Sequence, residues 1–219
     1  MSVIDLLDKG GPIAWILFGY SVVALAIVIE RSIFFARLGR LPGNFESQII
    51  GALRRGDADR VLAGATGPEA RLMRALVQAS GEGVQDLGRV GSRVGSEELQ
   101  RMERGFRTLG IMGNTATLLG LFGTVTGMIK AFMVIESAGG RVDAQALAGG
   151  IWEAMITTGV GLAVALPILI LLHTLEGMAD RRAHAMRTYA SLVLENLPHV
   201  PELDEGPVSH HSRAVADAV

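Results

Sequence analysis

Apolar residues in this chain gather into three long blocks that are separated by polar segments. The blocks cover residues 12–29, 109–135 and 151–172. Each is about as long as the helix needed to cross the roughly 30 Å apolar core of a bilayer. No segment shows the alternation typical of strands. The pattern therefore predicts an all-α, three-span helical membrane protein.

The polar boundaries divide the chain further. A helical insert with short amphipathic helices is expected between the first two spans. In that insert a glycine-rich patch is followed by a charged helix, which we expect to start at Ser96 and run into the second span. The predicted segments are a head at 1–11, spans at 12–35, 109–135 and 151–175, the insert at 36–108, a loop at 136–150, a helix at 176–197 and a disordered tail at 198–219.

Basic residues near the ends of the spans predict the orientation. Lys9 and Arg141 stand on one side of the predicted membrane, and Lys130 near the end of the second span is able to snorkel. The other side carries Arg31, Arg37, Arg40, Arg93, Arg101, Arg104, Arg107, Arg181, Arg182 and Arg187. We expect the amino terminus outside, in the periplasm of a bacterial cell, and both the insert and the carboxyl terminus in the cytoplasm. The acidic head and the length of the first block argue against a cleaved signal peptide.

Composition narrows the chemistry. The formal net charge is −2, which does not suggest a nucleic-acid partner, and the chain has no cysteine and five scattered histidines. Disulfides, thiolate metal sites and cysteine nucleophiles are therefore excluded. The glycine-rich patch does not match a phosphate-binding GxxxxGK[ST] loop. No nucleophile–base pair is visible, so we expect neither an enzyme nor a cofactor.

The second span carries small or hydroxylated residues at alternating intervals of four and three. At this spacing they form one stripe along a helix, and such stripes permit close helix packing in a bilayer. Packing accounts for the glycines, but Thr124 invites a second interpretation, a hydroxyl that faces a polar lumen. The stripe consists of Gly113, Thr117, Gly120, Thr124, Gly127 and Ala131, and Gly123 forms a GxxxG pair with Gly127.

The third span holds one carboxylate, Glu153, near its start. An acid inside a bilayer is costly and indicates function by default. At 3.6 residues per turn Glu153 lies about 40° around the helix from Thr157 and about 140° from Thr158. Gly150, Ala154, Thr157 and Gly161 form a second small stripe, and Pro167 is expected to bend the helix. The alternative is an interfacial acid that is favoured by the amino-terminal end of the helix.

Two spans with polar stripes suggest helices packed around a lumen. Three helices are too few to enclose one. A ring-shaped homo-oligomer, in which each subunit supplies two lumen-facing helices and one outer helix, would solve the geometry.

Two stretches of the chain, 98–132 and 146–167, carry the motifs GLFGTVTGM, GGIWEAM and TxxGLxxALP. With these motifs the chain resembles the ExbB/TolQ branch of the MotA/TolQ/ExbB proton-channel family, over about residues 12–197. The resemblance implies a bacterial inner-membrane motor subunit. It also implies a homopentamer around two copies of an ExbD/TolR-type single-span partner, whose membrane aspartate carries the protons. Force would pass to a TonB- or TolA-type protein.

The resemblance also implies roles for individual residues. The pore threonine of the second span falls on Thr124, and the glutamate and threonine of the third fall on Glu153 and Thr158. Thr157 is an additional hydroxyl, so either Thr157 or Thr158 is expected to face the pore. TonB-type or Tol-type output and proton or sodium coupling stay open, with protons favoured. The alternative function is a non-conducting membrane scaffold for a partner complex.

Overall fold

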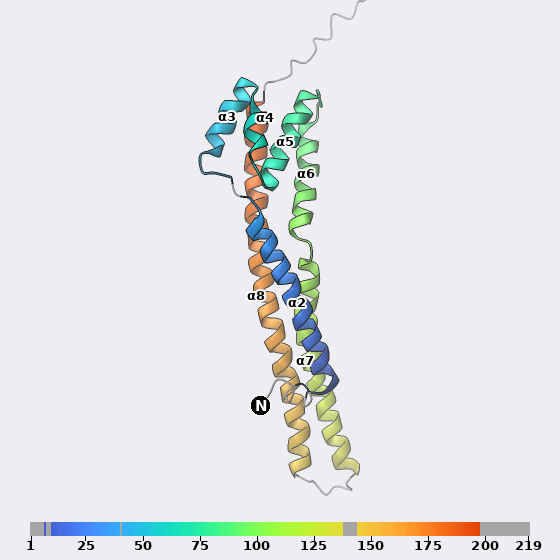
Figure 1. The fold of residues 1–219 in the computed structure, drawn as a ribbon. Coiled ribbons are helices and arrows are strands. Elements are labelled where there is room, and N and C mark those ends of the chain that lie inside the picture. The colour runs from blue at the N-terminus through green and yellow to red at the C-terminus, as the bar shows by residue number, and fades with distance from the viewer. Residues whose placement is uncertain (1–6, 8–9, 40, 138–143, 198–219) are drawn as a thin grey trace, which may run out of the picture.

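The computed structural model is an elongated, all-helical molecule (Figure 1), and it describes residues 7, 10–39, 41–137 and 144–197. Within these ranges there is no strand. The helices are α2 (Gly11–Arg37), α3 (Phe45–Arg55), α4 (Ala58–Ala63), α5 (Pro68–Gly81), α6 (Leu87–Met102), α7 (Phe106–Ser137) and α8 (Ala144–Asn196). Most of the predicted head, the centre of the predicted loop and the predicted tail lie outside the described residues.

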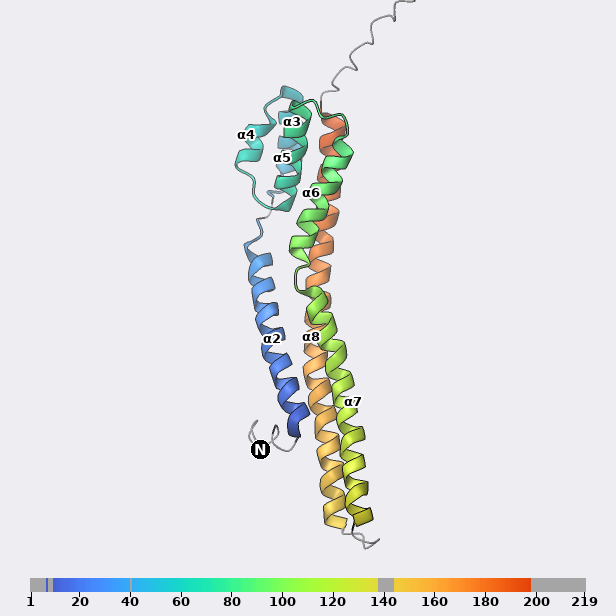
Figure 2. The same cartoon turned by 90° about the vertical axis from the view of Figure 1, so that its right-hand side faces the viewer.

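Three of the helices are long and apolar enough to cross a membrane, namely α2, α7 and the part of α8 from Leu147 onward. The prediction of an all-α protein with three spans is confirmed. Helices α7 and α8 form a long antiparallel hairpin, and α2 crosses it on one side (Figure 2). The predicted site residues all lie on this hairpin.

Helix α8 is continuous over 53 residues, which corresponds to about 80 Å at 1.5 Å per residue. It passes through Pro167 without ending, and it joins the predicted third span to the helix predicted at 176–197. It begins at Ala144, inside the segment predicted as a loop. One rigid element therefore reaches from the tip of the hairpin to the far end of the polar bundle.

Gly88, Gly91 and Gly95 of the glycine-rich patch lie in a helix, so the expected start at Ser96 is wrong. Helix α6 begins at Leu87, after Asp86 accepts a hydrogen bond from the backbone N–H of Arg89 at 2.8 Å. Burial of one apolar face, which includes Val90 and Leu99, offsets the helix-destabilising glycines. Nor does α6 run into the second span, because Gly105 with φ +89° separates it from α7.

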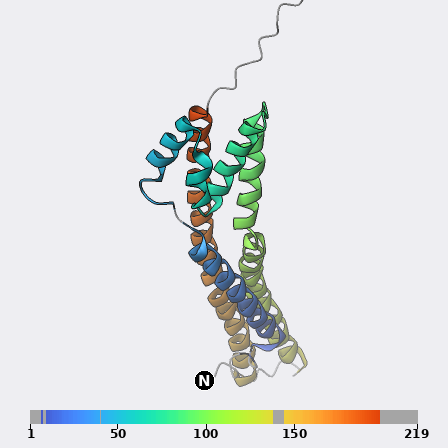
Figure 3. The same cartoon turned by 45° about the horizontal axis from the view of Figure 1, so that its top comes forward.

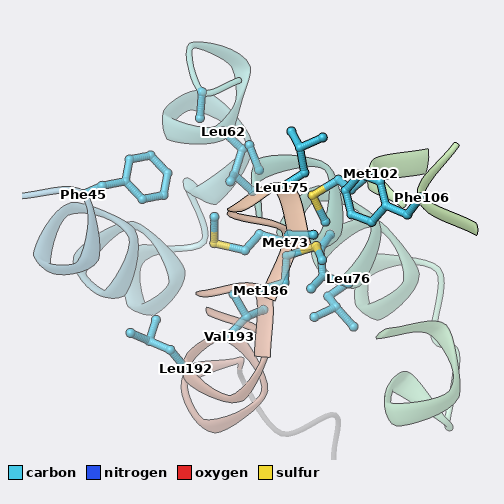
Figure 4. Close-up of a cluster of buried hydrophobic side chains, with 14 of the residues drawn as sticks. Phe45, Leu62, Met73, Leu76, Met102, Phe106, Leu175, Met186, Leu192 and Val193 are labelled. Atoms are coloured by element: carbon cyan, nitrogen blue, oxygen red, sulfur yellow. The ribbon is translucent and has the colours of Figure 1, made fainter. Parts of the chain in front are cut away.

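Helices α3 to α6 pack with the second half of α8 into a helical bundle (Figure 3). Figure 4 shows its core, in which Leu62, Met73, Leu76 and Val193 are fully buried and Phe45 closes one side. The burial of these side chains is the main favourable term for folding of the bundle. This apolar core continues into the spanning part of the hairpin, since Leu109, Ile168 and Leu172 belong to the same cluster of buried residues.

Charged side chains join the bundle to α8 and to the end of α2, and they also join α5 to α6. Arg182 of α8 donates to Glu69 of α5 at 3.0 Å and to the carbonyl of Leu38, just beyond α2, at 3.3 Å. Arg71 of α5 donates to Glu98 of α6, with Nε 2.9 Å from Oε1. Glu69 is 2% exposed, so its charge depends on Arg182 for compensation.

Candidate functional site

The hairpin contains a window without charged side chains. On α7 it covers residues 108–129 and on α8 residues 154–172, which correspond to about 33 Å and about 28 Å of helix. Both lengths match a bilayer core of about 30 Å. Lys130 and Glu153 end the window at one level, and Arg107 ends it at the other on α7. The predicted site residues lie inside this window or at its edge.

Glycines set the distance between α7 and α8. A β-carbon on Gly161 would lie 2.8 Å from the α-carbon of Gly120, and one on Gly127 would lie 2.8 Å from the β-carbon of Ala154. The other predicted packing glycines also face the opposite helix: Gly113 meets Leu169, Gly123 meets Thr157, and Gly150 meets Ala131. Only residues without side chains permit so close an approach of two backbones.

Thr157 and Thr158 take different positions at this interface. Thr157 is buried, fills the space at Gly123 and donates to the carbonyl of Ala154 at 2.7 Å. Thr158 is half-buried and donates across the hairpin to the carbonyl of Gly120 at 2.8 Å. Thr157 therefore packs between the two helices, whereas Thr158 lies at the margin of the interface and is partly accessible.

Thr124 and Thr158 share the flank of the hairpin that faces away from α2. Leu17 of α2 packs with Leu119 of α7 and Val160 of α8. At 100° per residue Thr124 lies about 140° around α7 from Leu119, and Thr158 about 160° around α8 from Val160. Thr124 is half-buried and donates to the carbonyl of Leu121 at 2.6 Å. The structure thus brings these two hydroxyls to one side.

Glu153 lies on the other flank, beside α2. Its Oε1 is 3.2 Å from the ammonium of Lys130, and a β-carbon on Gly11 at the start of α2 would lie 3.6 Å from the same oxygen. Glu153 and the pair of Thr124 and Thr158 are therefore not on one surface of this chain. Sequence reasoning missed Lys130 as a partner, although the pairing of Gly127 with Ala154 gives the register that brings it to Glu153.

The described residues hold no group of three or more His, Asp or Glu side chains placed to bind a metal ion. The site residues described above supply three threonine hydroxyls, one carboxylate and one ammonium. Such groups can hold water and protons along a narrow path, and they can also serve as hydrogen-bonded packing within a bilayer.

Three spanning helices, a glycine-packed hairpin and a helical bundle at one end define a multi-pass helical membrane protein. Residues 65–188 match the model of the MotA/TolQ/ExbB proton channel family. This match covers more than half of the chain, and the chain therefore belongs to that family, in its ExbB/TolQ branch.

Relatives in several organisms support the same assignment. An ExbB-like 1 biopolymer transport protein of Synechocystis is 30% identical over 82% of this chain and 73% of its own length. The Tol-Pal system protein TolQ of Haemophilus influenzae is 28% identical over 71% of this chain and 74% of its own. An ExbB homologue of Methanothermobacter thermautotrophicus is 26% identical over 82% of this chain, which spans 64% of that relative.

Proposed function

We propose that this chain is an inner-membrane proton-channel and motor subunit. It couples the proton motive force to work on a TonB- or TolA-type protein, for outer-membrane transport or envelope maintenance. The observation that carries the proposal is the presence of two hydroxyls, Thr124 and Thr158, on one flank of a hairpin whose family is named for a proton channel. Protons are the coupling ion, no cofactor is needed, and the chain is not an enzyme.

The subunit works in a ring, most simply a homopentamer, around two copies of an ExbD/TolR-type single-span partner. The exposed apolar face of α2 fits this arrangement. Trp15, Phe18, Val22 and Leu25 of α2 are exposed and apolar, which suits contact with lipid. If α2 faces lipid, the flank with Thr124 and Thr158 faces the axis of the ring. Each chain then supplies two lumen-facing helices and one outer helix.

In the cell the amino terminus lies in the periplasm, and the bundle and the carboxyl terminus lie in the cytoplasm. The positions of basic residues support this orientation. Arg31, Arg37 and Arg107 lie at the bundle end of the spans, and Arg31 donates to the carbonyl of Arg101 at 3.1 Å. Lys130 lies at the opposite end of the charge-free window.

Each predicted site residue then has a role. Thr124 and Thr158 line the proton path, and Thr157 packs the hairpin against Gly123 instead of lining it. Glu153 acts at the outer end of the hairpin, beside the start of α2. Six glycines keep α7 and α8 in close contact, at positions 113, 120, 123, 127, 150 and 161. Pro167 lies in α8 on the bundle side of Thr158.

Proton flux into liposomes tests the proposal. The chain is reconstituted with its single-span partner, and a pH-sensitive dye inside the liposomes records the flux under a membrane potential. We expect Thr158→Ala to reduce the flux by about a factor of ten or more, and each lost factor of ten corresponds to about 1.4 kcal/mol. The matched control is Thr115→Ala, because the Thr115 hydroxyl donates to the carbonyl of Ile111 at 2.7 Å on the flank towards α2.

A non-conducting membrane scaffold is the second candidate function. One observation favours it: the hydroxyls of Thr124, Thr157 and Thr158 all donate to backbone carbonyls, as purely structural threonines do. A scaffold assembles and supports its system whether or not Thr158 keeps its hydroxyl. Assembly with an unchanged envelope phenotype in Thr158→Ala would therefore favour the scaffold over the channel.

A further inference from the structure

Lys130 and Glu153 form an ion pair between α7 and α8, with 3.2 Å from Nζ to Oε1. The side chain of Lys130 is 63% exposed and that of Glu153 is 37% exposed. Lys130 is one of two lysines in the chain, and the other, Lys9, lies in the amino-terminal head. No other charged side chain lies between Arg107 and Glu136 on α7 or between Gln145 and Glu176 on α8. Within the described residues, each member of the pair is thus the nearest opposite charge for the other.

The position of the pair makes each charge dependent on the other. Both residues stand where the charge-free windows of α7 and α8 end, at the boundary of the apolar core. Removal of one member leaves a single charge beside the apolar core, in which a charged side chain is costly. Truncation of one partner of a partly desolvated pair also leaves the other uncompensated. The pair therefore holds the outer ends of the two helices in one register.

The start of α2 lies against the same carboxylate. Gly11 adopts φ +63°, and a β-carbon there would lie 3.6 Å from Oε1 of Glu153. Pro12 follows as one of the first helical residues. The amino-terminal end of a helix favours a nearby negative charge. The carboxylate of Glu153 is therefore stabilised both by the start of α2 and by the ammonium of Lys130. All three spanning helices meet at this carboxylate.

Glu153 is also separated from the two hydroxyls of the proposed path. Thr158 lies about 140° around α8 from Glu153, on the flank away from α2. A carboxylate that shared protons with Thr124 and Thr158 would be expected on their side of the hairpin. Its placement beside α2 and Lys130 instead suits a fixed charge that positions helices.

We propose that Lys130 is a positioning residue and that Glu153 acts through its ion pair with Lys130, as a fixed charge and not as a carrier of protons. The pair locks the outer ends of α7 and α8 to the start of α2 and so sets the spacing of the flank that holds Thr124 and Thr158. This inference rests on the proposed function, since it assigns a role within the same channel.

Exchange of the two charges separates a positioning role from a proton-carrying role. Lys130→Gln and Glu153→Gln each break the pair, and we expect proton flux with the partner to fall by about a factor of ten, or about 1.4 kcal/mol. The double variant Lys130→Glu with Glu153→Lys restores an ion pair in the opposite sense. We expect it to recover part of the flux, because the pair between α7 and α8 is restored while a lysine at position 153 faces the positive amino-terminal end of α2. If the exchanged variant assembles but conducts no better than Glu153→Gln, the inference is wrong.

A distance measurement gives a second readout that does not depend on conduction. The chain lacks cysteine, so spin labels attach only at introduced sites such as Met133→Cys and Met155→Cys, which are both exposed. We expect a narrow distance distribution in the parent and the exchanged variant, and a broad one in Lys130→Gln and Glu153→Gln. Identical distributions in all four would overturn the inference.

The matched control breaks an ion pair elsewhere in the chain. Arg93→Gln removes the exposed Arg93–Glu97 pair of α6, which is 3.1 Å long, and should change neither the flux nor the distances. If the parent chain with its partner conducts no protons, the proposed function fails. The spin-label distances still decide whether Lys130 and Glu153 position the helices.

Discussion

Gly161 of α8 lies directly against Gly120 of α7, so that a β-carbon on Gly161 would stand 2.8 Å from the α-carbon of Gly120 and 2.9 Å from the carbonyl oxygen of Ala116. This is a contact of backbone with backbone, and no side chain can move aside to relieve it. The spacing of the whole hairpin, and with it the position of Thr158 against Gly120, depends on the absence of a side chain at this point.

Gly161→Ala should therefore destabilise the protein. The added methyl forces α7 and α8 apart, and overpacking of this kind costs about 1–3 kcal/mol. The thermal unfolding of the detergent-solubilised chain measures the effect. Gly159→Ala is the control on the same helix, since nothing lies within 4 Å of the β-carbon it would add, and alanine is the better helix former. Equal melting temperatures for the two variants would contradict the close contact.

Arg182→Met should destabilise the bundle strongly. Glu69 is 2% exposed, and Arg182 is the side chain that compensates its charge, at 3.0 Å. Removal of one member of a buried ion pair costs about 3–5 kcal/mol, because the remaining charge is buried alone. Chemical unfolding followed by circular dichroism measures the loss. The neighbouring Arg181 is exposed, so Arg181→Met should leave stability nearly unchanged, and a similar loss in both variants would refute the role of the pair.

Tyr189 should make stability fall at alkaline pH. Burial, together with the carboxylates of Glu46 and Glu69, raises the pKa of Tyr189 above its ordinary value of 10.0. The folded state therefore holds the phenolic proton more tightly than the unfolded chain does. This contribution is complete below about pH 10 and is lost as the pH rises through the pKa of the folded state.

The measurement compares the parent with Tyr189→Phe, which keeps the edge-on ring contact with Phe45 at 6.1 Å. Between about pH 9 and pH 11 the stability of the parent should decline more steeply than that of the variant. Parallel declines would show that Tyr189 titrates alike in both states. Tyr20→Phe is the control, since Tyr20 lies in α2 away from these carboxylates.

The spanning part of the fold could be predicted from sequence because its physics is local. Long apolar blocks define the three spans, and intervals of four and three place Gly113, Gly120 and Gly127 on one line of a helix. The structure places these three glycines against α8. The spacing of residues within one helix does not show which residue of the neighbouring helix each of them contacts. Lys130 becomes the partner of Glu153 only when two helices are set in antiparallel register, which is a property of the pair.

The bundle was harder to predict for a different reason. Gly88, Gly91 and Gly95 carry a poor intrinsic helix propensity, which suggested an irregular patch. In the structure they belong to α6, since Leu87, Val90 and Val94 pack on the bundle core. Tertiary burial outweighs local preference here. The helix break at Gly105 could not be predicted either, because the charged residues before it continue a helical pattern up to the second span.

Because α8 is one uninterrupted helix, it can transmit a rotation from the membrane to the bundle. Thr158 lies in the membrane window, and Arg182 and Tyr189 lie in the bundle on the same helix. About 36 Å of helix separates Thr158 from Arg182. The helix between them does not end, although Pro167 cannot donate one backbone hydrogen bond, so a turn of α8 at the level of Thr158 turns Arg182 with it. Helices α6 and α7 do not share this property, since Gly105 divides them. In the proposed motor, torque that arises at the level of Thr158 would pass to the bundle along α8, whereas Gly105 interrupts the helical path from α7 to α6.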